Sequence, residues 1–390
     1  MKFVRVGIIG VGNMGYSHAF NIAAGKIDGM VLSALCDTDP ARQKVCKEKF
    51  PDIIFTPDYT ELFKKDICDA VIIATPHRLH ADIAIKALEA GLHILTEKPM
   101  DIRVSKARLL CETAKKSDRI FGIMFNQRTN PIFARAREIV QTGKLGELKR
   151  SVWIITNWYR TQYYYNSGGW RATWGGEGGG VLINQAPHNL DIWQWICGMP
   201  TSITAFCDTA KYHNIEVEDD VTIFARYENG ATGTFITTTG ETPGTNRFEI
   251  SGTKGKMVLE QGILKLWLLK ENERDICFGL KQNFVSPETE YSEFRPDTPE
   301  TAHNGILQNF ANAILFGEPL LAAGVDGINE LMISNAAYLS QWTGNRECLL
   351  PIDAEAFDRE LDKKISQSDF CDKTTERVIS SDASRWQVRW

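Results

Sequence analysis

The chain has 390 residues, of which 43% are hydrophobic and 24% are charged, and these ordinary globular values exclude a disordered chain, a collagen and a coiled-coil rod. Its formal net charge of −5 gives no basic field that would attract a phosphate backbone, which argues against a nucleic-acid partner. No apolar run approaches the roughly 20 residues of a membrane helix, and the first apolar stretch is too short for a signal peptide, so we expect a two-domain cytoplasmic protein with no membrane partner.

Short apolar runs alternate with amphipathic segments over the first 125 residues. The pattern predicts strands over 3–9, 30–36, 69–74, 92–96 and 120–125, and helices over segments that include 81–90 and 104–116. Alternation of strand and helix is typical of a parallel sheet that is covered on both faces. We therefore predict a doubly wound α/β domain over residues 1–125.

The pattern changes after residue 126. A helix is predicted over 131–142, followed by strands over 148–156, 203–207, 220–227, 231–238, 246–251 and 256–259. Asn229-Gly230 between two of these strands is typical of a tight hairpin turn. Helices over 182–197, 306–316 and 327–342 are expected to cover one face of this antiparallel or mixed sheet. We predict an α+β domain over 126–365 and a polar tail over 366–390.

A glycine-rich turn follows the first strand and precedes a helix. Its first glycine permits the tight turn, its second lets the backbone approach a pyrophosphate, and its third lets helix and strand pack closely. The amides that open the helix would face the anion. The alternative is an ordinary strand-to-helix turn. The residues are Gly10, Val11, Gly12, Asn13, Met14 and Gly15.

Asp37 follows the second predicted strand, where a carboxylate can accept hydrogen bonds from both ribose hydroxyls of a dinucleotide. The same charge would repel a 2′-phosphate, so NAD is favoured over NADP as the cofactor. Ligands of a doubly wound sheet bind beyond the carboxyl ends of its strands. The other residues expected to line this crevice are Thr75, Pro76, His77, His80, Glu97, Lys98, Asn126 and Gln127.

The nine cysteines are scattered without a CxxC pair, which predicts reduced thiols in the core. The carboxylates near His77 and His80 do not complete a recognisable ligand set, so we expect no bound metal.

Seven aromatic residues, with arginines between them, are concentrated in residues 157–180. Flat rings cover the C–H faces of sugars while polar groups bind hydroxyls. The same composition is also typical of a subunit interface, and both interpretations stay open. The candidate substrate contacts in this segment are Tyr159, Tyr164, Trp170, Arg171 and Trp174.

Four motifs together resemble the glucose-fructose oxidoreductase, inositol dehydrogenase and MocA family (Gfo/Idh/MocA), over about residues 3–352. They are the glycine turn, the TPxxxH segment at 75–80, the Glu97-Lys98-Pro99 triplet, and Gly178-Gly179-Gly180 with His188 and Asp191. The resemblance implies a Rossmann domain followed by an α+β domain with an open, largely antiparallel mixed sheet. That sheet would hold the substrate against the nicotinamide and would mediate homo-oligomer formation.

The resemblance also implies that Lys98 reaches a substrate hydroxyl and that His188 is the general base. Three glycines before His188 would allow close approach of a ligand. Asn184, His188 and Asp191 would share one face of a helix, so Asn184 and Asp191 are expected to contact the substrate or to orient the His188 ring, although Pro187 predicts that the helix begins near it. Many members of the family have Asp where this chain has Asn184, which cannot accept a proton but can hydrogen-bond to a sugar hydroxyl.

We therefore expect an NAD-dependent dehydrogenase that oxidises a secondary hydroxyl of a sugar, cyclitol or glycoside. The resemblance to the family suggests a pyranoside that is oxidised at C3. One alternative is redox-neutral glycoside cleavage, in which transient oxidation permits elimination and NAD is recycled. Another is a non-catalytic NAD-binding regulatory protein, which Asn184 favours and the retained Lys98 and His188 oppose.

Overall fold

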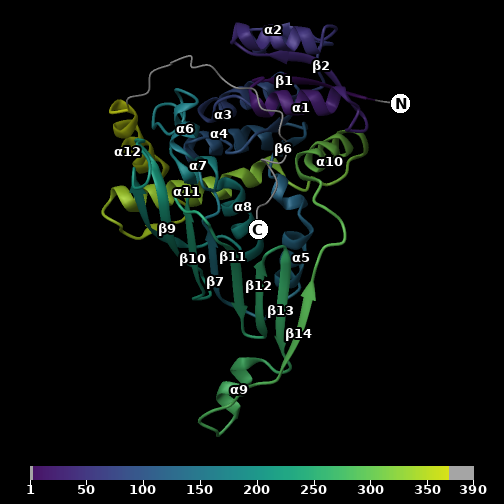
Figure 1. Cartoon of the computed structure of the whole chain (residues 1–390). Coiled ribbons are helices and arrows are strands. Elements are labelled where there is room, and N and C mark those ends of the chain that lie inside the picture. The colour runs from purple at the N-terminus through teal and green to yellow at the C-terminus, as the bar shows by residue number, and fades with distance from the viewer. Residues whose placement is uncertain (1–2, 369–390) are drawn as a thin grey trace.

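The computed structural model describes residues 3–368, which form two sheets with their helices (Figure 1). The first sheet has the strand order β3-β2-β1-β4-β5-β6, and each of its strand pairs is parallel. This confirms the predicted doubly wound sheet. Its strands are β1 (Val4–Ile9), β2 (Met30–Cys36), β3 (Ile54–Thr56), β4 (Ala70–Ile73), β5 (His93–Thr96) and β6 (Phe121–Ile123). Its helices are α1 (Asn13–Ala23), α2 (Pro40–Lys49), α3 (His80–Glu89) and α4 (Val104–Lys115).

The second sheet is mixed, because β10 pairs with β7 in parallel while its other strand pairs are antiparallel. This confirms the predicted architecture. Its order is β14-β13-β12-β11-β7-β10-β9-β8-β15. The strands are β7 (Leu148–Ile155), β8 (Ser202–Thr209), β9 (Glu218–Arg226), β10 (Thr232–Thr238), β11 (Asn246–Gly252), β12 (Gly255–Glu260), β13 (Ile263–Leu269), β14 (Thr289–Phe294) and β15 (Cys348–Leu349).

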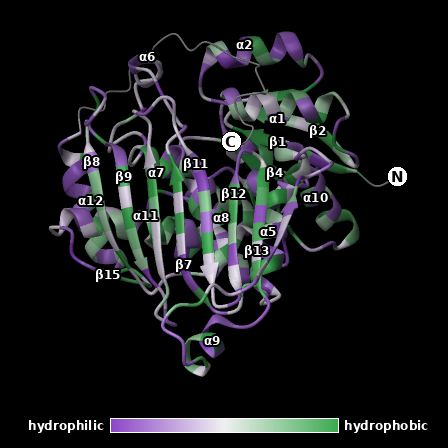
Figure 2. Cartoon of the chain, turned by 60° about the horizontal axis from the view of Figure 1, so that its bottom comes forward, coloured by the Kyte–Doolittle hydropathy of each residue, from purple (hydrophilic) through white to green (hydrophobic). Residues whose placement is uncertain are grey.

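Helices pack on one face of this second sheet, and in Figure 2 they lie behind its strands. They include α5 (Pro131–Gln141), α8 (Pro187–Cys197) and α11 (Gly327–Trp342). Alternate residues of the strands are buried against them, as the period of a strand requires. Trp153 stacks on Phe248 with ring centroids 4.5 Å apart and is fully buried, so the core lies between this face and the helices.

The structure differs from two of the helix predictions. The segment predicted as one helix over 182–197 is divided into α7 (Val181–Asn184) and α8, because Pro187 occupies the first helical turn, where a missing N–H is tolerated. The helix predicted over 306–316, α10 (Ala302–Phe316), lies beside the first sheet instead of covering the second (Figure 1). There the amide of Asp28 donates to Gln308 at 2.8 Å.

Further short elements complete the described chain, among them α6 (Gln162–Asn166), α9 (Glu273–Gly279) and α12 (Ala354–Ser366). The strands β13 and β14 were not predicted. Cys277 on α9 is exposed, so the prediction of a core thiol is wrong there, whereas Cys36, Cys46, Cys68, Cys111 and Cys207 are buried. Most of the predicted tail, residues 369–390, lies outside the described residues. No helix within residues 3–368 is both long and apolar enough to cross a bilayer.

Candidate active site

The glycine turn between β1 and α1 is built as its sequence predicts. Gly10 has φ of +88°, and a Cβ on it would lie 2.6 Å from the carbonyl oxygen of Ala74. A Cβ on Gly15 would lie 1.9 Å from the oxygen of Gly10, so helix and strand can pack only around glycine. A Cβ on Gly12 would have no described atom within 4 Å. The turn therefore leaves open space at its middle glycine.

The first turn of α1 can bind an anion at this open space. Within residues 3–368, no side chain caps the amides that open the helix at Asn13 and Met14. Asp37, directly after β2, accepts from the amide of Val11 at 2.7 Å through Oδ2 and from the amide of Asp39 at 3.0 Å through Oδ1. Each carboxylate oxygen keeps a further lone pair with which it can accept a ribose hydroxyl.

Several buried polar atoms at the carboxyl ends of these strands lack a hydrogen-bond partner within the described chain. They are Thr75 Oγ1, His77 Nδ1 and Asn126 Oδ1. Unpaired buried polar groups are costly and are typical of a site that a ligand completes. The residues present therefore fit a bound dinucleotide. Gln127 lies in the same 3₁₀ turn as Asn126 and accepts from Asn189 Nδ2 at 3.4 Å.

His80 has a different role from the predicted one. Its Nδ1 lies 2.7 Å from the carbonyl oxygen of Pro99 and its Nε2 lies 2.7 Å from that of Thr75. Since both ring nitrogens are occupied and the ring is 1% exposed, His80 ties two strand ends together and has no nitrogen left for a cofactor. Pro76 precedes this clamp as the residue that leads into the turn at His77.

Glu97 is buried beneath the site and is paired with a histidine of α1. His18 Nε2 lies 2.8 Å from Glu97 Oε1. Burial alone would raise the pKa of Glu97, but the hydrogen bond to His18, together with nearby positive charges that include Lys98, lowers the pKa to about 2. The ring of His303, at the start of α10, lies 5.8 Å from that of His18. Glu97 is therefore a fixed negative charge next to Lys98.

Lys98 and His188 come together from the two halves of the chain. Lys98 Nζ donates to the backbone oxygen of Asn184 at 2.6 Å, which brings the segment after β5 to the end of α7, three residues before α8 begins. Burial lowers the pKa of His188 well below its usual value, and the charge of Lys98 lowers it further. Burial also lowers the pKa of Lys98, although Glu97 opposes this effect. The His188 imidazole, whose Nδ1 has no hydrogen-bond partner among the described residues, thus lies near the amino group of Lys98.

Glu177 is a site residue that sequence analysis missed. Its carboxyl group is 2% exposed, accepts from the amide of Ala172 at 2.7 Å and accepts from Asn184 Nδ2. Arg171 Nη1 lies 4.0 Å from Glu177 Oε1. Burial raises the pKa of Glu177, and the positive charges of Arg171 and Lys98 oppose that rise. An acidic residue directly before three glycines was the available signal.

Part of the aromatic segment forms a shelf beside these groups. The guanidinium group of Arg171 lies 4.6 Å from the ring centroids of both Tyr164 and Trp170 and donates to the Tyr164 hydroxyl at 2.8 Å. Trp170 meets the ring of His77 edge-on, with 5.8 Å between centroids. Gln185 Nε2 donates to the same Tyr164 hydroxyl at 3.2 Å. The predicted contacts Tyr164, Trp170 and Arg171 therefore adjoin the crevice.

The same segment also supplies the core. Trp174, a predicted substrate contact, is 6% exposed and packs edge-on against Tyr338 and Trp342, so the structure places its ring in the core. Tyr165 is likewise buried and shares a hydrogen bond of 2.6 Å with Thr239. Tyr159 is 45% exposed and stays a prediction.

Asp191 does not face the crevice. Its two carboxylate oxygens accept from Arg128 Nε and Nη2 at 2.8 and 2.6 Å, and both side chains are almost fully buried. Arg128 also binds Asp326 at 2.7 Å. Asp191 therefore anchors α8 to the core, and the predicted contact with substrate is replaced by this ion pair.

The three glycines before α7 approach protein atoms instead of a ligand. A Cβ on Gly178 would lie 2.5 Å from Ile102 Cγ2, and one on Gly179 would lie 2.2 Å from the Tyr338 hydroxyl oxygen. A Cβ on Gly180 would lie 1.9 Å from the backbone oxygen of Glu218. The Glu218 carboxylate accepts from the amides of Gly180 and Leu182. The glycines bring α7 and Asn184 close to β9.

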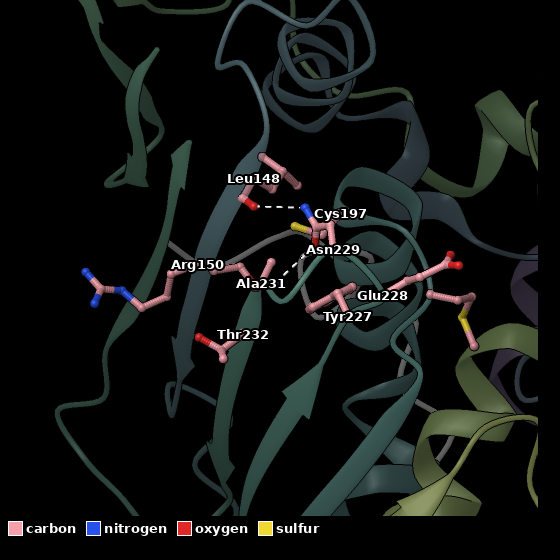
Figure 3. A pocket seen from close by; sticks show the side chains of 10 residues that line it. Leu148, Arg150, Cys197, Tyr227, Glu228, Asn229, Ala231 and Thr232 are labelled. Atoms are coloured by element: carbon pink, nitrogen blue, oxygen red, sulfur yellow. Dashed lines mark hydrogen bonds between the residues drawn. The ribbon is translucent and has the colours of Figure 1, made fainter. Parts of the chain in front are cut away.

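A hollow of about 400 Å³ lies away from these residues (Figure 3). It is lined by the turn between β9 and β10 and by the carboxyl end of α8, including Cys197, Tyr227 and Asn229. Because α8 begins at the crevice and ends at this hollow, the two are separate.

Models of one protein family match both halves of the chain. Residues 4–125 match the model described as an oxidoreductase family with an NAD-binding Rossmann fold, and residues 133–258 match the model of the Gfo/Idh/MocA C-terminal domain. Together the two matches cover more than half of the sequence.

The named relatives include two dehydrogenases and one glycosidase. Myo-inositol 2-dehydrogenase of Thermotoga maritima is 25% identical over 86% of this chain and 95% of its own length. Levoglucosan dehydrogenase of Pseudarthrobacter phenanthrenivorans is 27% identical over 66% of this chain and 74% of its own length. α-N-Acetylgalactosaminidase of Shewanella oneidensis is 31% identical, over 45% of this chain and 40% of its own length.

A solved structure shares the fold over most of its length. The WlbA dehydrogenase of Chromobacterium violaceum, in complex with NADH and UDP-GlcNAcA, is 26% identical with a TM-score of 0.76. The likeness covers 90% of this chain and 97% of that one.

Proposed function

Because the chain belongs to the Gfo/Idh/MocA oxidoreductases and is an NAD-dependent enzyme, we propose that it oxidises a secondary hydroxyl of a sugar, cyclitol or glycoside to the ketone. The observation that carries the proposal is the meeting of Lys98 and His188 beside the carboxyl ends of the first sheet. This arrangement supports a role for a positive and a neutral proton-carrying group beside the position expected for a dinucleotide ring.

The cofactor would be held by residues of the first sheet. The amides of Asn13 and Met14 at the open space of Gly12 would bind the pyrophosphate, and Asp37 would bind the adenosine ribose. His77 Nδ1 and Asn126 Oδ1, which lack a hydrogen-bond partner in the described chain, would bind the nicotinamide end. When bound, NAD supplies the acceptor for the hydride that the carbinol carbon loses.

The residues of the crevice would manage the proton. His188 is held neutral by burial and by the charge of Lys98, so it can accept the hydroxyl proton without first losing one of its own. The Lys98 ammonium would donate a hydrogen bond to the developing alkoxide, which is a strong charge-assisted interaction in a buried site. Glu97 beside it keeps the ammonium form favourable.

The shelf of Tyr164, Trp170 and Arg171 supports a ring-shaped substrate. Aromatic faces cover C–H surfaces of a pyranose or an aglycone, and the guanidinium group donates to hydroxyls. We propose a pyranoside with an aglycone as substrate and C3 as the position oxidised.

The test is a panel of sugars, cyclitols and glycosides with NAD, followed by two variants on the best substrate. Lys98→Met and His188→Ala should each lower kcat by about 10³-fold or more, while NADH affinity, measured by fluorescence, changes by less than about threefold. Lys86→Met on the exposed face of α3 is the matched control and should leave kcat unchanged. An unchanged rate in either crevice variant would remove that residue from the mechanism.

Redox-neutral glycoside cleavage is a second candidate, favoured by the similarity to α-N-acetylgalactosaminidase. Transient oxidation would acidify the adjacent C–H bond, elimination would release the aglycone, water would add to the resulting double bond, and the hydride would return to the sugar. Absorbance of reduced nicotinamide separates the two functions. Stoichiometric accumulation supports the dehydrogenase, and aglycone release without accumulation supports cleavage.

We also propose that the second sheet mediates formation of a homo-oligomer. Phe206 and Phe224 on its strands β8 and β9 are 56% and 37% exposed, and Tyr291 on β14 is 48% exposed. Exposed aromatic rings on one surface favour a protein contact. Light scattering on the purified chain measures the number of subunits, and a monomer at all concentrations would refute this assignment.

A further inference from the structure

Asn184 connects the two charged groups of the crevice. Its backbone oxygen accepts from Lys98 Nζ at 2.6 Å, and its side-chain nitrogen Nδ2 donates to Glu177 Oε1. The second carboxyl oxygen of Glu177, Oε2, accepts from the amide of Ala172 at 2.7 Å. Both oxygens of Glu177 are therefore occupied by donors, and the group is 2% exposed.

This arrangement fixes which way the Asn184 amide faces. Glu177 Oε1 accepts from Asn184 Nδ2, and Arg171, 4.0 Å from this oxygen, favours the ionised carboxylate, which can only accept, so the NH₂ group of Asn184 turns toward Glu177. The amide oxygen Oδ1 is then the atom that remains for a ligand. Asn184 is partly exposed, whereas Glu177 is buried, so the substrate can meet the amide but not the carboxylate.

We propose that Glu177 is a positioning residue that turns Asn184 Oδ1 toward a substrate hydroxyl as a neutral hydrogen-bond acceptor. The inference rests on the proposed function. The pair of Glu177 and Asn184 takes the place of the Asp that many members of the family carry at the position of Asn184. The Glu177 carboxylate contacts Asn184 and not the substrate, and His188 accepts the proton.

Glu177→Gln should reverse the orientation of the Asn184 amide. The amide of Ala172 continues to require an acceptor, so the oxygen of the introduced glutamine side chain faces Ala172 and its NH₂ group faces Asn184. Asn184 must then reverse, and its NH₂ group replaces Oδ1 at the substrate. The substrate hydroxyl, which donates to Oδ1 in the wild type, would then face an NH₂ donor. KM should therefore rise by about tenfold or more, with kcat much less affected.

Asn184→Asp creates the opposite conflict, because it places two carboxyl groups within hydrogen-bond distance. They can remain together only by sharing a proton, so kcat/KM should fall by about tenfold or more, and the loss should grow as the pH rises. In the double variant Glu177→Gln/Asn184→Asp, the NH₂ group of the introduced glutamine donates to the introduced carboxylate, and an acceptor again faces the substrate. We expect kcat/KM within about threefold of the wild type.

Glu218→Gln is the matched control. Glu218 is another buried carboxyl group that binds this segment, through the amides of Gly180 and Leu182, but it has no bond to the Asn184 side chain. Combining Glu218→Gln with Asn184→Asp should give no recovery. A purely structural role for Glu177 would lower the melting temperature and NADH affinity of Glu177→Gln without a selective change in KM.

The double variant decides the question. Recovery of KM supports the proposal, whereas additive losses, or a Glu177→Gln variant with wild-type KM, would overturn it. If no substrate is found, the proposed function fails, and the pair can still be tested through stability. The melting temperature of Asn184→Asp should fall from pH 6 to pH 8 relative to that of the wild type. Adding Glu177→Gln should remove this fall. The same pH slope with and without Glu177→Gln would refute the pairing.

Discussion

Two glycine-rich segments precede the two halves of the crevice, and they use the small residue for opposite purposes. In the segment at Gly10, Gly12 and Gly15, the middle glycine has no described atom within 4 Å of its missing side chain. In the segment at 178–180, a Cβ built on any of the three glycines would lie 2.5 Å or less from another protein atom. The first segment makes room for a ligand, and the second makes room for the protein's own core.

The comparison shows why a run of glycines does not by itself indicate a binding site. Gly180 lets the backbone of α7 approach β9, where Glu218 and Tyr338 hold it, and this contact sets the position of Asn184. The effect on the crevice is real but indirect. Substitution at the two segments should therefore separate folding from cofactor binding.

Gly180→Ala should have the largest effect. The added Cβ would lie 1.9 Å from the backbone oxygen of Glu218, and neither backbone can move without breaking the sheet contact. We expect a loss of about 4 kcal/mol or more in unfolding free energy, measured by denaturant unfolding. Gly279→Ala, whose added Cβ meets no described atom within 4 Å, is the control and should unfold like the wild type. Wild-type stability of Gly180→Ala would show that the second segment has free space after all.

Glu218→Gln should change how the stability depends on pH. Burial raises the pKa of Glu218 from 4.5 to about 7. The folded state therefore holds this proton more tightly than the unfolded state, and the stability it contributes is complete below pH 4.5 and is lost as the pH rises through 7. The loss is about 3 kcal/mol, and the Gln variant, which stays neutral, should lack it.

Unfolding free energies at pH 5 and pH 8 measure this difference. Asp101, whose pKa burial also raises to about 7, is present in both proteins, so the slope should become smaller without disappearing. Equal slopes in the two proteins would mean that Glu218 is ionised in the folded state.

Much of the fold could be predicted because its signals are local. The strands of the first sheet are short apolar runs, and Pro187 indicated the start of α8. The position of α10 could not be predicted, because the hydrophobic pattern of a helix shows which face is buried but not which sheet that face packs on. That choice depends on distant contacts such as Gln308 with Asp28. The strands β13 and β14 were missed altogether.

The predicted site residues that lie near one another are those whose position a motif fixes. Lys98 and His188 meet because strand ends and a helix start bring them together. Composition does not distinguish a ring in the core from one at a site, and the predicted contact Trp174 lies in the core. Glu177 was missed because its role depends on a contact with Asn184 that no spacing rule contains.

Gly12→Ala should separate binding from folding. Gly12 has φ of −67°, which alanine adopts readily, and the new methyl group would enter the open space. The melting temperature of the protein without cofactor should therefore stay unchanged, while the affinity for NADH falls by about 100-fold. Titration of NADH fluorescence measures the affinity. Unaltered binding would show that the dinucleotide does not approach this turn.

Asp37→Asn should have the smallest effect and tests the choice of dinucleotide. An Asn side chain can still accept from the amide of Val11, although not at the same time from that of Asp39, so the glycine turn keeps its bond to this side chain. The loss of the charge should weaken NADH binding by about tenfold and should remove the repulsion of a 2′-phosphate. The ratio of NADH to NADPH affinity is the quantity to measure, because a general loosening of the turn would weaken both cofactors equally and leave the ratio unchanged. A ratio that falls assigns the discrimination to the Asp37 charge, and a constant ratio assigns it to another residue.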